Sequence, residues 1–313
     1  MFSTDGQIDA ARGHLRVAKL SEEVACANPM HKGFVERALT ELTSEELVRF
    51  ELFLGFCERG GASVEHIAGC YLTVVEDTLG EQMYFLRHEK YRHSNYAEVA
   101  DFVYHNREYM SRYMYGLVVT AFLWPNHVQM ARFFREKLPR DKRGAYLEIG
   151  PGHGYYMMTA VSESAFDRFA GVDISEASIA QTRAMLAFFA PQASSRIELR
   201  HCDFLDATTL APASFDAVVM GEVLEHVEQP GAFLRRIAEL SRSDAFIYVT
   251  TCINAPAVDH IYLWRSTDEL EALFKESGFA IREALRLPYE GRTLEQAVAQ
   301  TLSINVAYIL EKA

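Results

Sequence analysis

Residues 145–154, AYLEIGPGHG, decide the fold of this chain because they join a short apolar strand to a glycine-rich turn. Glu148 stands near the end of the strand, and Gly150, Gly152 and Gly154 follow at alternate positions. Glycines allow a sharp turn and let backbone N–H groups approach a ligand with no Cβ in the way. Such a turn predicts a nucleotide-binding α/β fold when an acidic residue ends the next strand. Asp173 in GVDIS, at the end of the next apolar run, meets that condition.

From residue 145 onward, short apolar runs alternate with helical patterns. This alternation predicts a parallel sheet with helices on both faces. Two further β-patterned runs, IREALRLPY and INVAYILEK, close the chain. The strands before these two runs are expected near residues 145–149, 168–173, 197–201, 215–220 and 245–250.

The first part of the chain has a different pattern. Apolar residues recur there with the i, i+3, i+4, i+7 spacing of helices that bury one face. We therefore expect a helical substrate-cap domain over residues 1–125 and an α/β domain over residues 126–313. Asn95 is expected to open a long tyrosine-rich helix that reaches towards Leu123 and is ended by Pro125. Asn126 is expected to open the next helix.

Composition limits the class of protein. The 313 residues carry a formal net charge of −12, which disfavours a general electrostatic grip on nucleic acid phosphates. Five cysteines, an odd number without a C-x-x-C pair, favour a reducing cytoplasm over a disulfide framework. We expect no secretory signal in the N-terminal MFSTDGQIDAARGH and no membrane segment, since no apolar run reaches about 18 residues. A cytoplasmic protein without nucleic acid or membrane partners is expected.

Taken together, LEIGPGHG, GVDIS, HCDF and FDAVVMGEVLEHVEQP resemble the class I S-adenosylmethionine-dependent methyltransferases. The likeness is greatest to the small-molecule branch that includes quinone and natural-product enzymes, and it covers roughly residues 127–313. It implies a Rossmann-like, seven-stranded doubly wound sheet whose last strand inserts antiparallel. It also implies S-adenosyl-L-methionine as cofactor and S-adenosyl-L-homocysteine as product.

The resemblance assigns the first cofactor contacts. The three glycines of the turn would pass under the methionine part of the cofactor, at the start of a helix whose N–H groups favour its carboxylate. Glu148 would face the ammonium group, directly or through water. Asp173 would hold the ribose, because the two oxygens of a carboxylate can accept both hydroxyl protons. Ile174 would pack against adenine.

Further along the chain, Asp203 in HCDF would accept a hydrogen bond from the adenine amino group. Phe204 would offer a backbone N–H and an apolar wall. Gly221 and Glu222 would border both the methionine end of the cofactor and the substrate.

An oxygen acceptor usually needs a general base, whereas an amine needs only to be neutral. The candidates are Glu222 and His226 after the fourth strand and His260 after the fifth. His260 is preferred because its neighbour Asp259 could orient the ring and raise its pKa.

The aromatic residues before the sheet are expected to shape the acceptor pocket. Tyr113, Tyr115, Trp124 and His127 are the predicted contacts, since aromatic rings can shield a sulfonium and line an apolar pocket. No metal site is expected. Glu81, His88 and His93 are the residues considered, and at about 100° per residue His93 points away from the other two.

The predicted function is therefore methyl transfer to an O or N atom of a small-molecule acceptor, a secondary metabolite. One alternative is a catalytically idle cofactor-binding partner subunit. A second is an NAD(P)-dependent oxidoreductase, but its third glycine should follow the second by three residues, where Tyr155 stands. A tRNA or protein methyltransferase is weakened by the acidic charge. The oligomeric state is left open, with a homodimer as one option.

Overall fold

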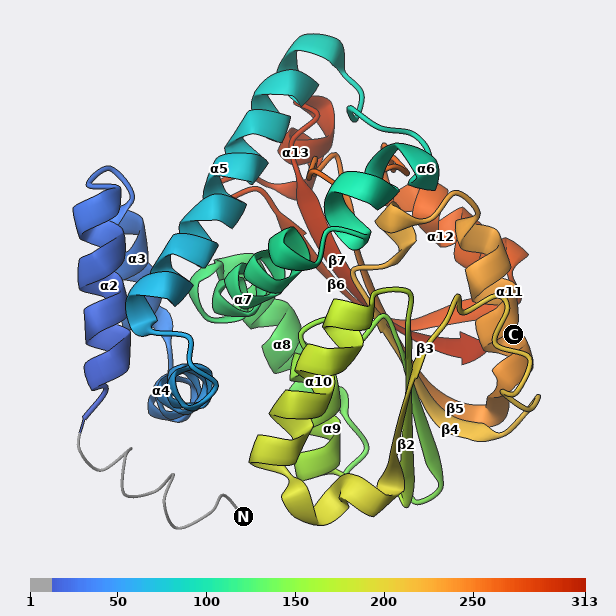
Figure 1. Ribbon diagram of the computed structural model, residues 1–313. Coiled ribbons are helices and arrows are strands. Elements are labelled where there is room, and N and C mark those ends of the chain that lie inside the picture. Colours follow the sequence, from blue (N-terminus) through green and yellow to red (C-terminus); the bar gives the residue numbers. More distant parts are fainter. Residues whose placement is uncertain (1–12) are drawn as a thin grey trace.

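A seven-stranded sheet of order β3-β2-β1-β4-β5-β7-β6 forms the frame of the second half of the chain (Figure 1). The strands β1 to β5 run parallel, while β7 lies antiparallel between β5 and β6. The expected α/β fold with an inserted antiparallel last strand is thus confirmed. The bounds are β1 Ala145–Ile149, β2 Arg168–Asp173, β3 Ile197–His201, β4 Phe215–Gly221, β5 Ser241–Ile253, β6 Phe279–Pro288 and β7 Ile304–Lys312.

The computed structural model describes residues 13–313. Most of the N-terminal stretch in which no secretory signal was expected therefore lies outside the described residues. Within them, no helix has the length and apolar character needed to cross a membrane.

Helices cover both faces of the sheet, which explains why β1 is buried along its whole length. The first face carries α8, α9 and α10, and the second carries α11, α12 and α13. Their bounds are α8 Pro125–Lys137, α9 Tyr155–Glu163, α10 Glu176–Phe189, α11 Pro230–Leu240, α12 Thr267–Glu276 and α13 Leu294–Ala299, with short 3-10 turns η2 Pro191–Arg196 and η3 Leu224–His226.

The residues before the sheet are helical, as expected. A capping box formed by Thr43 and Glu46 opens α4, with each side chain accepting from the other residue's backbone N–H. The bounds are α2 Leu15–Ala27, α3 Lys32–Glu41, α4 Ser44–Arg59, α5 Val64–His88, α6 Tyr96–Val99, the π-helical turn η1 Ala100–Tyr104, and α7 Arg107–Leu123.

The prediction of one long helix from Asn95 to Leu123 is wrong. Asn95 caps only the four residues of α6, and Asn106 opens α7 by accepting a hydrogen bond from the Tyr109 N–H. The start of the next helix also differs. Pro125 is the first residue of α8, where its missing N–H costs nothing, and the Asn126 side chain donates to Asn305 instead of capping.

One continuous apolar core joins the first helices to the sheet. Buried residues of α2, α4, α5 and α7 belong to the same cluster as those of α8 and α9 and the sheet residues Tyr146 and Tyr248. Charged side chains reinforce the contact, since Glu163 of α9 accepts from Arg49 of α4 at 2.5 Å and from Arg135 of α8 at 3.0 Å. The expected domain boundary at residue 125 therefore runs through a shared core.

Candidate cofactor and acceptor site

The glycine turn after β1 has the left-handed backbone conformation that its composition suggests. Gly150, Gly152 and Gly154 have φ values of 64°, 54° and 81°, a region that favours glycine. At Gly150 a Cβ would also lie only 2.7 Å from Cγ2 of Val223. The turn therefore presents bare backbone at the start of α9, which suits the carboxylate of an adenosyl cofactor.

Asp173 ends β2 and faces this turn. Its carboxylate accepts from the Gly152 N–H at 3.1 Å and from the Ser175 N–H at 2.8 Å. Burial raises the pKa of Asp173 to about 6, despite these two hydrogen bonds that favour the charged form. The carboxylate is thus placed where a ribose diol could donate to it.

A large cavity opens beside Asp173, at the carboxyl ends of β1, β2 and β4, where α/β folds bind ligands. Its volume of about 660 Å³ lies within the range of small-molecule sites. The predicted site residues that line it are Gly150, Gly152, Asp173, Ile174, Asp203, Phe204, Gly221, Glu222, His226, His260, Tyr113, Trp124 and His127.

Three predicted site residues do not line the cavity. Glu148 is buried within the sheet, where Tyr146 OH donates to it and burial raises its pKa to about 8, so its contact with the ammonium group, directly or through water, stays a prediction. Gly154 lies behind the turn as the N-cap of α9. Tyr115 packs among the helices, with its ring edge-on to His66.

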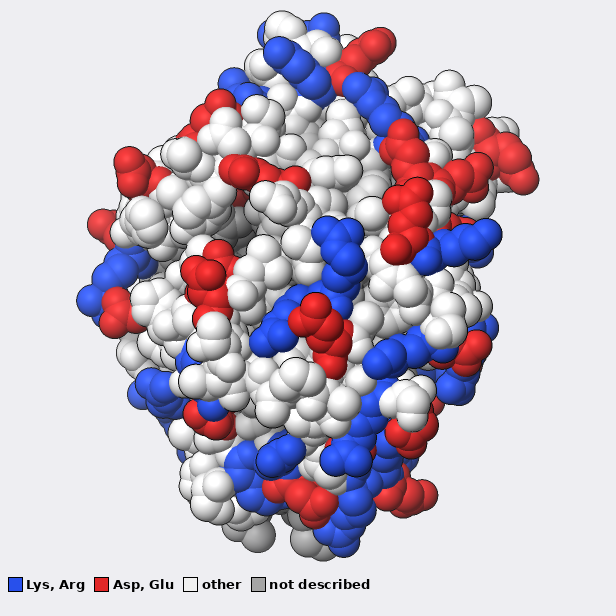
Figure 2. Space-filling model, turned by 90° about the vertical axis from the view of Figure 1, so that its right-hand side faces the viewer, with Lys and Arg blue, Asp and Glu red and all other residues white. Residues whose placement is uncertain are grey.

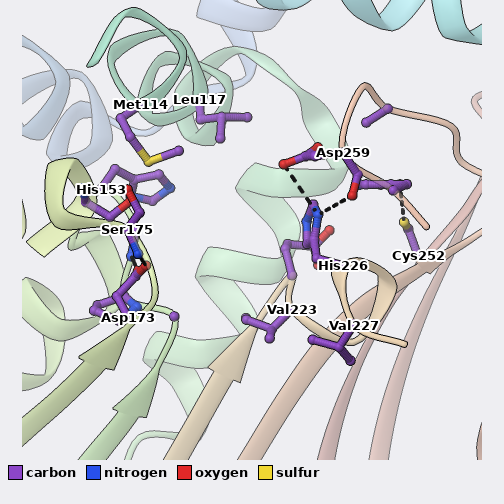
Figure 3. A pocket seen from close by; sticks show the side chains of 18 of the residues that line it. Met114, Leu117, His153, Asp173, Ser175, Val223, His226, Val227, Cys252 and Asp259 are labelled. Carbon is purple, nitrogen blue, oxygen red and sulfur yellow. Dashed lines mark hydrogen bonds and ion pairs between the residues drawn. The ribbon is translucent and has the colours of Figure 1, made fainter. Parts of the chain in front are cut away.

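Helix α7 forms the apolar wall opposite the sheet. Met114 and Leu117 point from it towards the cavity, above His153 and Ser175 of the cofactor side (Figure 3). Val74 of α5 and Met110 extend this wall. The sequence did not predict these residues, because a methionine at helical spacing cannot be distinguished from an ordinary residue of the hydrophobic core.

On the other side of the cavity, Asp259 contacts His226 rather than its sequence neighbour (Figure 3). The His226 Nδ1 lies 3.1 Å from the backbone oxygen of Asp259 and 3.4 Å from its carboxylate. Tyr104 and Tyr113 donate to the same carboxylate at 3.2 and 3.5 Å. The two tyrosines come from the helical part, so residues far apart in sequence build this network.

His260 does not have the partner expected for it. Its Nδ1 lies 2.6 Å from the backbone oxygen of Ala255, and its ring stands edge-on to that of His226 at 4.7 Å. Burial lowers the pKa of His260 to about 4, and the charge of Asp259, which acts to raise this pKa as expected, is too weak to offset the burial. His260 nevertheless lines the cavity.

Two carboxyl groups lie beside these histidines. Glu225 is fully buried, and Thr251 donates a hydrogen bond to it at 2.6 Å. Glu222 follows β4 with a φ of 52°, and its N–H donates to the Thr250 carbonyl at 3.1 Å. Burial raises the pKa of both carboxyls, and the negative charge of Glu222 raises the pKa of Glu225 further. No Lys or Arg is among the described residues that line the cavity.

Charges on the outer surface are mixed. Figure 2 shows Lys and Arg side chains interspersed with Asp and Glu on the face that it presents, with broad uncharged areas between them. This face therefore carries no continuous basic surface.

Comparison with known proteins agrees with this geometry. Residues 147–247 match the family described as a methyltransferase domain. No curated protein matches the chain. One similar solved structure is phosphoethanolamine N-methyltransferase 2 of Haemonchus contortus, with 15% identity, a TM-score of 0.53, and coverage of 70% of this chain and 60% of that chain. Another is geranyl diphosphate C-methyltransferase from Streptomyces coelicolor A3(2), with 14% identity, a TM-score of 0.51, and coverage of 66% and 81%.

At these identities the solved structures establish the fold, while the family match covers the strands and turns that line the cofactor side of the cavity. The glycine cradle and the carboxylate of Asp173 fit an adenosyl cofactor. Residues 147–247 therefore form a methyltransferase domain, within a fold that the chain shares with methyltransferases of known structure.

Proposed function

We propose that the protein methylates an O or N atom of a small, uncharged or cationic organic acceptor, a secondary metabolite. The observation that carries this proposal is the composition of the cavity, which combines an apolar helical wall with acidic groups and has no Lys or Arg among its described lining residues.

The apolar wall supports a partly aromatic acceptor. Met110, Met114, Leu117 and Trp124 line the part of the cavity beneath α7. Thioether and aromatic side chains pack well against flat rings. Sites of this composition bind organic molecules of small to moderate size.

The charge of the cavity argues against an anionic acceptor. Burial lowers the pKa values of His127 and His153 to about 4, so both rings are neutral near pH 7 and supply no positive charge. Glu222 and Asp259 add acidic groups on the acceptor side. The similar structures named above hold geranyl-S-thiolodiphosphate and phosphomonomethylethanolamine, and we do not expect this chain to accept phosphorylated compounds of that kind.

The cofactor supplies the reactive methyl group, and the protein holds the acceptor in line with it. In this proposal Asp173, Asp203 and Ile174 hold the adenosine part. The proton that the acceptor loses is taken up at Glu222, His226 or His260. Asp259 makes His226 a stronger candidate than the sequence suggested, because it orients that ring.

The helices before residue 126 are proposed to serve as the substrate cap. Tyr96 and Tyr104 line the cavity from the segment between α5 and α7. The backbone N–H of Tyr96 donates to Glu228 at 2.9 Å, which attaches this segment to the loop after β4. The acceptor would therefore be enclosed between the cap and the ends of the strands.

The test is release of S-adenosylhomocysteine from labelled cofactor with three matched acceptors: a polycyclic phenol, the corresponding aryl amine, and the phosphate ester of the phenol. We expect turnover with the phenol or the amine and at least tenfold less with the ester. Preferential turnover of the ester would contradict the proposed charge selectivity. Cofactor binding with no product from any of the three would favour the idle partner subunit.

A further inference from the structure

Five side chains with metal-binding atoms meet at the ends of β4 and β5. The ligand atoms of Glu225, His226 and His260 lie within 4.8 Å of one another, and so do those of Glu222, Glu225 and Cys252. Glu225 belongs to both groups, so the five form one cluster. Sequence analysis considered these residues singly and expected no metal.

We propose that this cluster binds one divalent transition-metal ion, with Glu225, His226 and His260 as its principal ligands and Glu222 as a fourth. The proposal that the ion binds does not depend on the proposed function, whereas the role given to the ion below rests on it.

The two histidines are held as metal-binding histidines usually are. The Nδ1 of His226 lies 3.1 Å from the backbone oxygen of Asp259, and the Nδ1 of His260 lies 2.6 Å from that of Ala255. A neutral ring that donates from Nδ1 to a carbonyl has an unprotonated Nε2. The Nε2 of His226 lies 4.0 Å from Oε1 of Glu225, so this lone pair faces the carboxylate.

The distances require only a small contraction. Ligand atoms about 2.1 Å from an ion lie roughly 3 to 4 Å apart, depending on the angle between them. The ligand atoms of each group lie at most 4.8 Å apart, so binding needs side-chain rotations and no change of fold.

Charge gives an independent reason for a cation here. The Oε1 atom of Glu222 is buried with no hydrogen-bond partner, and Glu225 is fully buried beside it. A buried carboxylate without a counter-charge is costly, and no Lys or Arg is among the described residues that line this cavity. A divalent ion would compensate both carboxylates.

The donor set indicates which ions would bind. Two imidazoles and two carboxylates suit Mn²⁺, Co²⁺ or Zn²⁺, whereas Mg²⁺ and Ca²⁺ prefer oxygen ligands and water. The Cys252 thiol, whose sulfur lies within 4.8 Å of ligand atoms of Glu222 and Glu225, would favour the softer ions of this series.

The position of the cluster assigns the ion a role. Glu222, His226 and His260 all line the cavity, whereas Glu225 lies behind them, so an ion would have open coordination positions towards the acceptor. A hydroxyl bound there would lose its proton more easily. Its oxygen forms the new C–O bond as the C–S bond breaks, the sulfur keeps the bonding pair, and the proton passes to solvent. The acceptor class is then narrowed to hydroxyl compounds, and the two histidines act as ligands instead of bases.

The test is a titration of the chelator-treated full chain with Co²⁺, followed by visible absorption and by calorimetry, and with Mn²⁺ followed by calorimetry. We expect one ion per chain and d–d absorption bands from Co²⁺. His226→Ala and His260→Ala should each lower the affinity at least tenfold. His105→Ala is the matched control, because His105 also lies beside a carboxylate, Asp101 at 3.2 Å, but is exposed and far from the cluster in the sequence.

Glu225→Gln extends the test, but the residue is fully buried and its replacement could prevent folding, so the histidine variants decide the outcome. Binding of S-adenosylhomocysteine to the same samples shows whether each variant is folded. The proposal is overturned if the wild type binds no ion, or if both histidine variants bind as the wild type does. Failure of the proposed function would look different, because the ion would then bind while neither the phenol nor the amine gave product.

Discussion

The affinity for the cofactor should depend on the charge of Asp173. With a pKa of about 6 in the cofactor-free protein, the side chain is ionised in about 90% of molecules at pH 7 and about 10% at pH 5. If the ribose hydroxyls donate to the carboxylate, the affinity for S-adenosylhomocysteine should fall about tenfold between these two pH values. The free energy of unfolding of the cofactor-free protein should instead rise as the pH falls through about 6, because a raised pKa means that the ionised form of Asp173 destabilises the fold.

The variant Asp173→Asn removes the charge and keeps the shape. The N–H groups of Gly152 and Ser175 donate to different carboxylate oxygens, at 3.1 and 2.8 Å, so asparagine keeps an acceptor for one of them. Loss of charged hydrogen bonds to the ribose should cost about 1.5–3 kcal/mol, roughly a 10- to 150-fold weaker affinity at pH 7. The variant should also lose the decline in affinity between pH 7 and pH 5.

Isothermal titration calorimetry with S-adenosylhomocysteine at pH 7, 6 and 5 measures both effects. Asp244→Asn is the control, since this exposed aspartate lies near the start of β5, at the opposite end of the sheet. Equal affinity of Asp173→Asn and the wild type at pH 7, with no pH dependence in either, would refute the ribose assignment.

Two further substitutions test the frame of the site. Gly150→Ala should lower the cofactor affinity, and it should lower the free energy of unfolding by about 1–3 kcal/mol, because φ is 64° and the new Cβ would meet Val223. A double variant with Val223→Ala should recover part of both losses. An unchanged melting temperature and cofactor affinity would contradict the role given to the glycine turn. Glu163→Gln should lower the free energy of unfolding by about 1.5–3 kcal/mol, because it removes the charge that Glu163 of α9 shares with Arg49, Arg135 and Arg140, while Arg49 keeps its ion pair with Glu45. The exposed Glu136→Gln serves as control in urea denaturation, and equal effects of the two would argue against a structural role for this network.

The sequence predicted best those segments in which few residue types fit the local backbone conformation. β1, β2 and β3 have the predicted bounds. β1 and β2 are short apolar runs that end before Gly150 and at Asp173, whereas β3 alternates apolar and polar residues. The glycine turn and Asp173 were predicted as well. The prediction of one long helix was wrong at Asn106, because its side chain accepts a hydrogen bond from the Tyr109 N–H and so starts a new helix.

The acceptor side was much less predictable. Asp259 is adjacent to His260 in sequence, yet it contacts His226, because neighbouring side chains in an irregular loop need not face the same way. Tyr104 reaches this network from the helical part, across more than a hundred residues. Glu225 and Cys252 come from the ends of different strands, and only the parallel pairing of β4 with β5 brings them together.

The core that the first helices share with the sheet restricts how ligands enter and leave. Swinging those helices away as a rigid body would expose the buried faces of α4, α5 and α7 to water, at a cost comparable to unfolding. Val99 and Val103 of the segment from α6 through η1 belong instead to a smaller cluster, which also contains Ile261, Val74 of α5 and Met110 of α7. We therefore expect exchange of cofactor and product to occur by local loosening of this short π-helical stretch, so that turnover is tied to the mobility of a few residues.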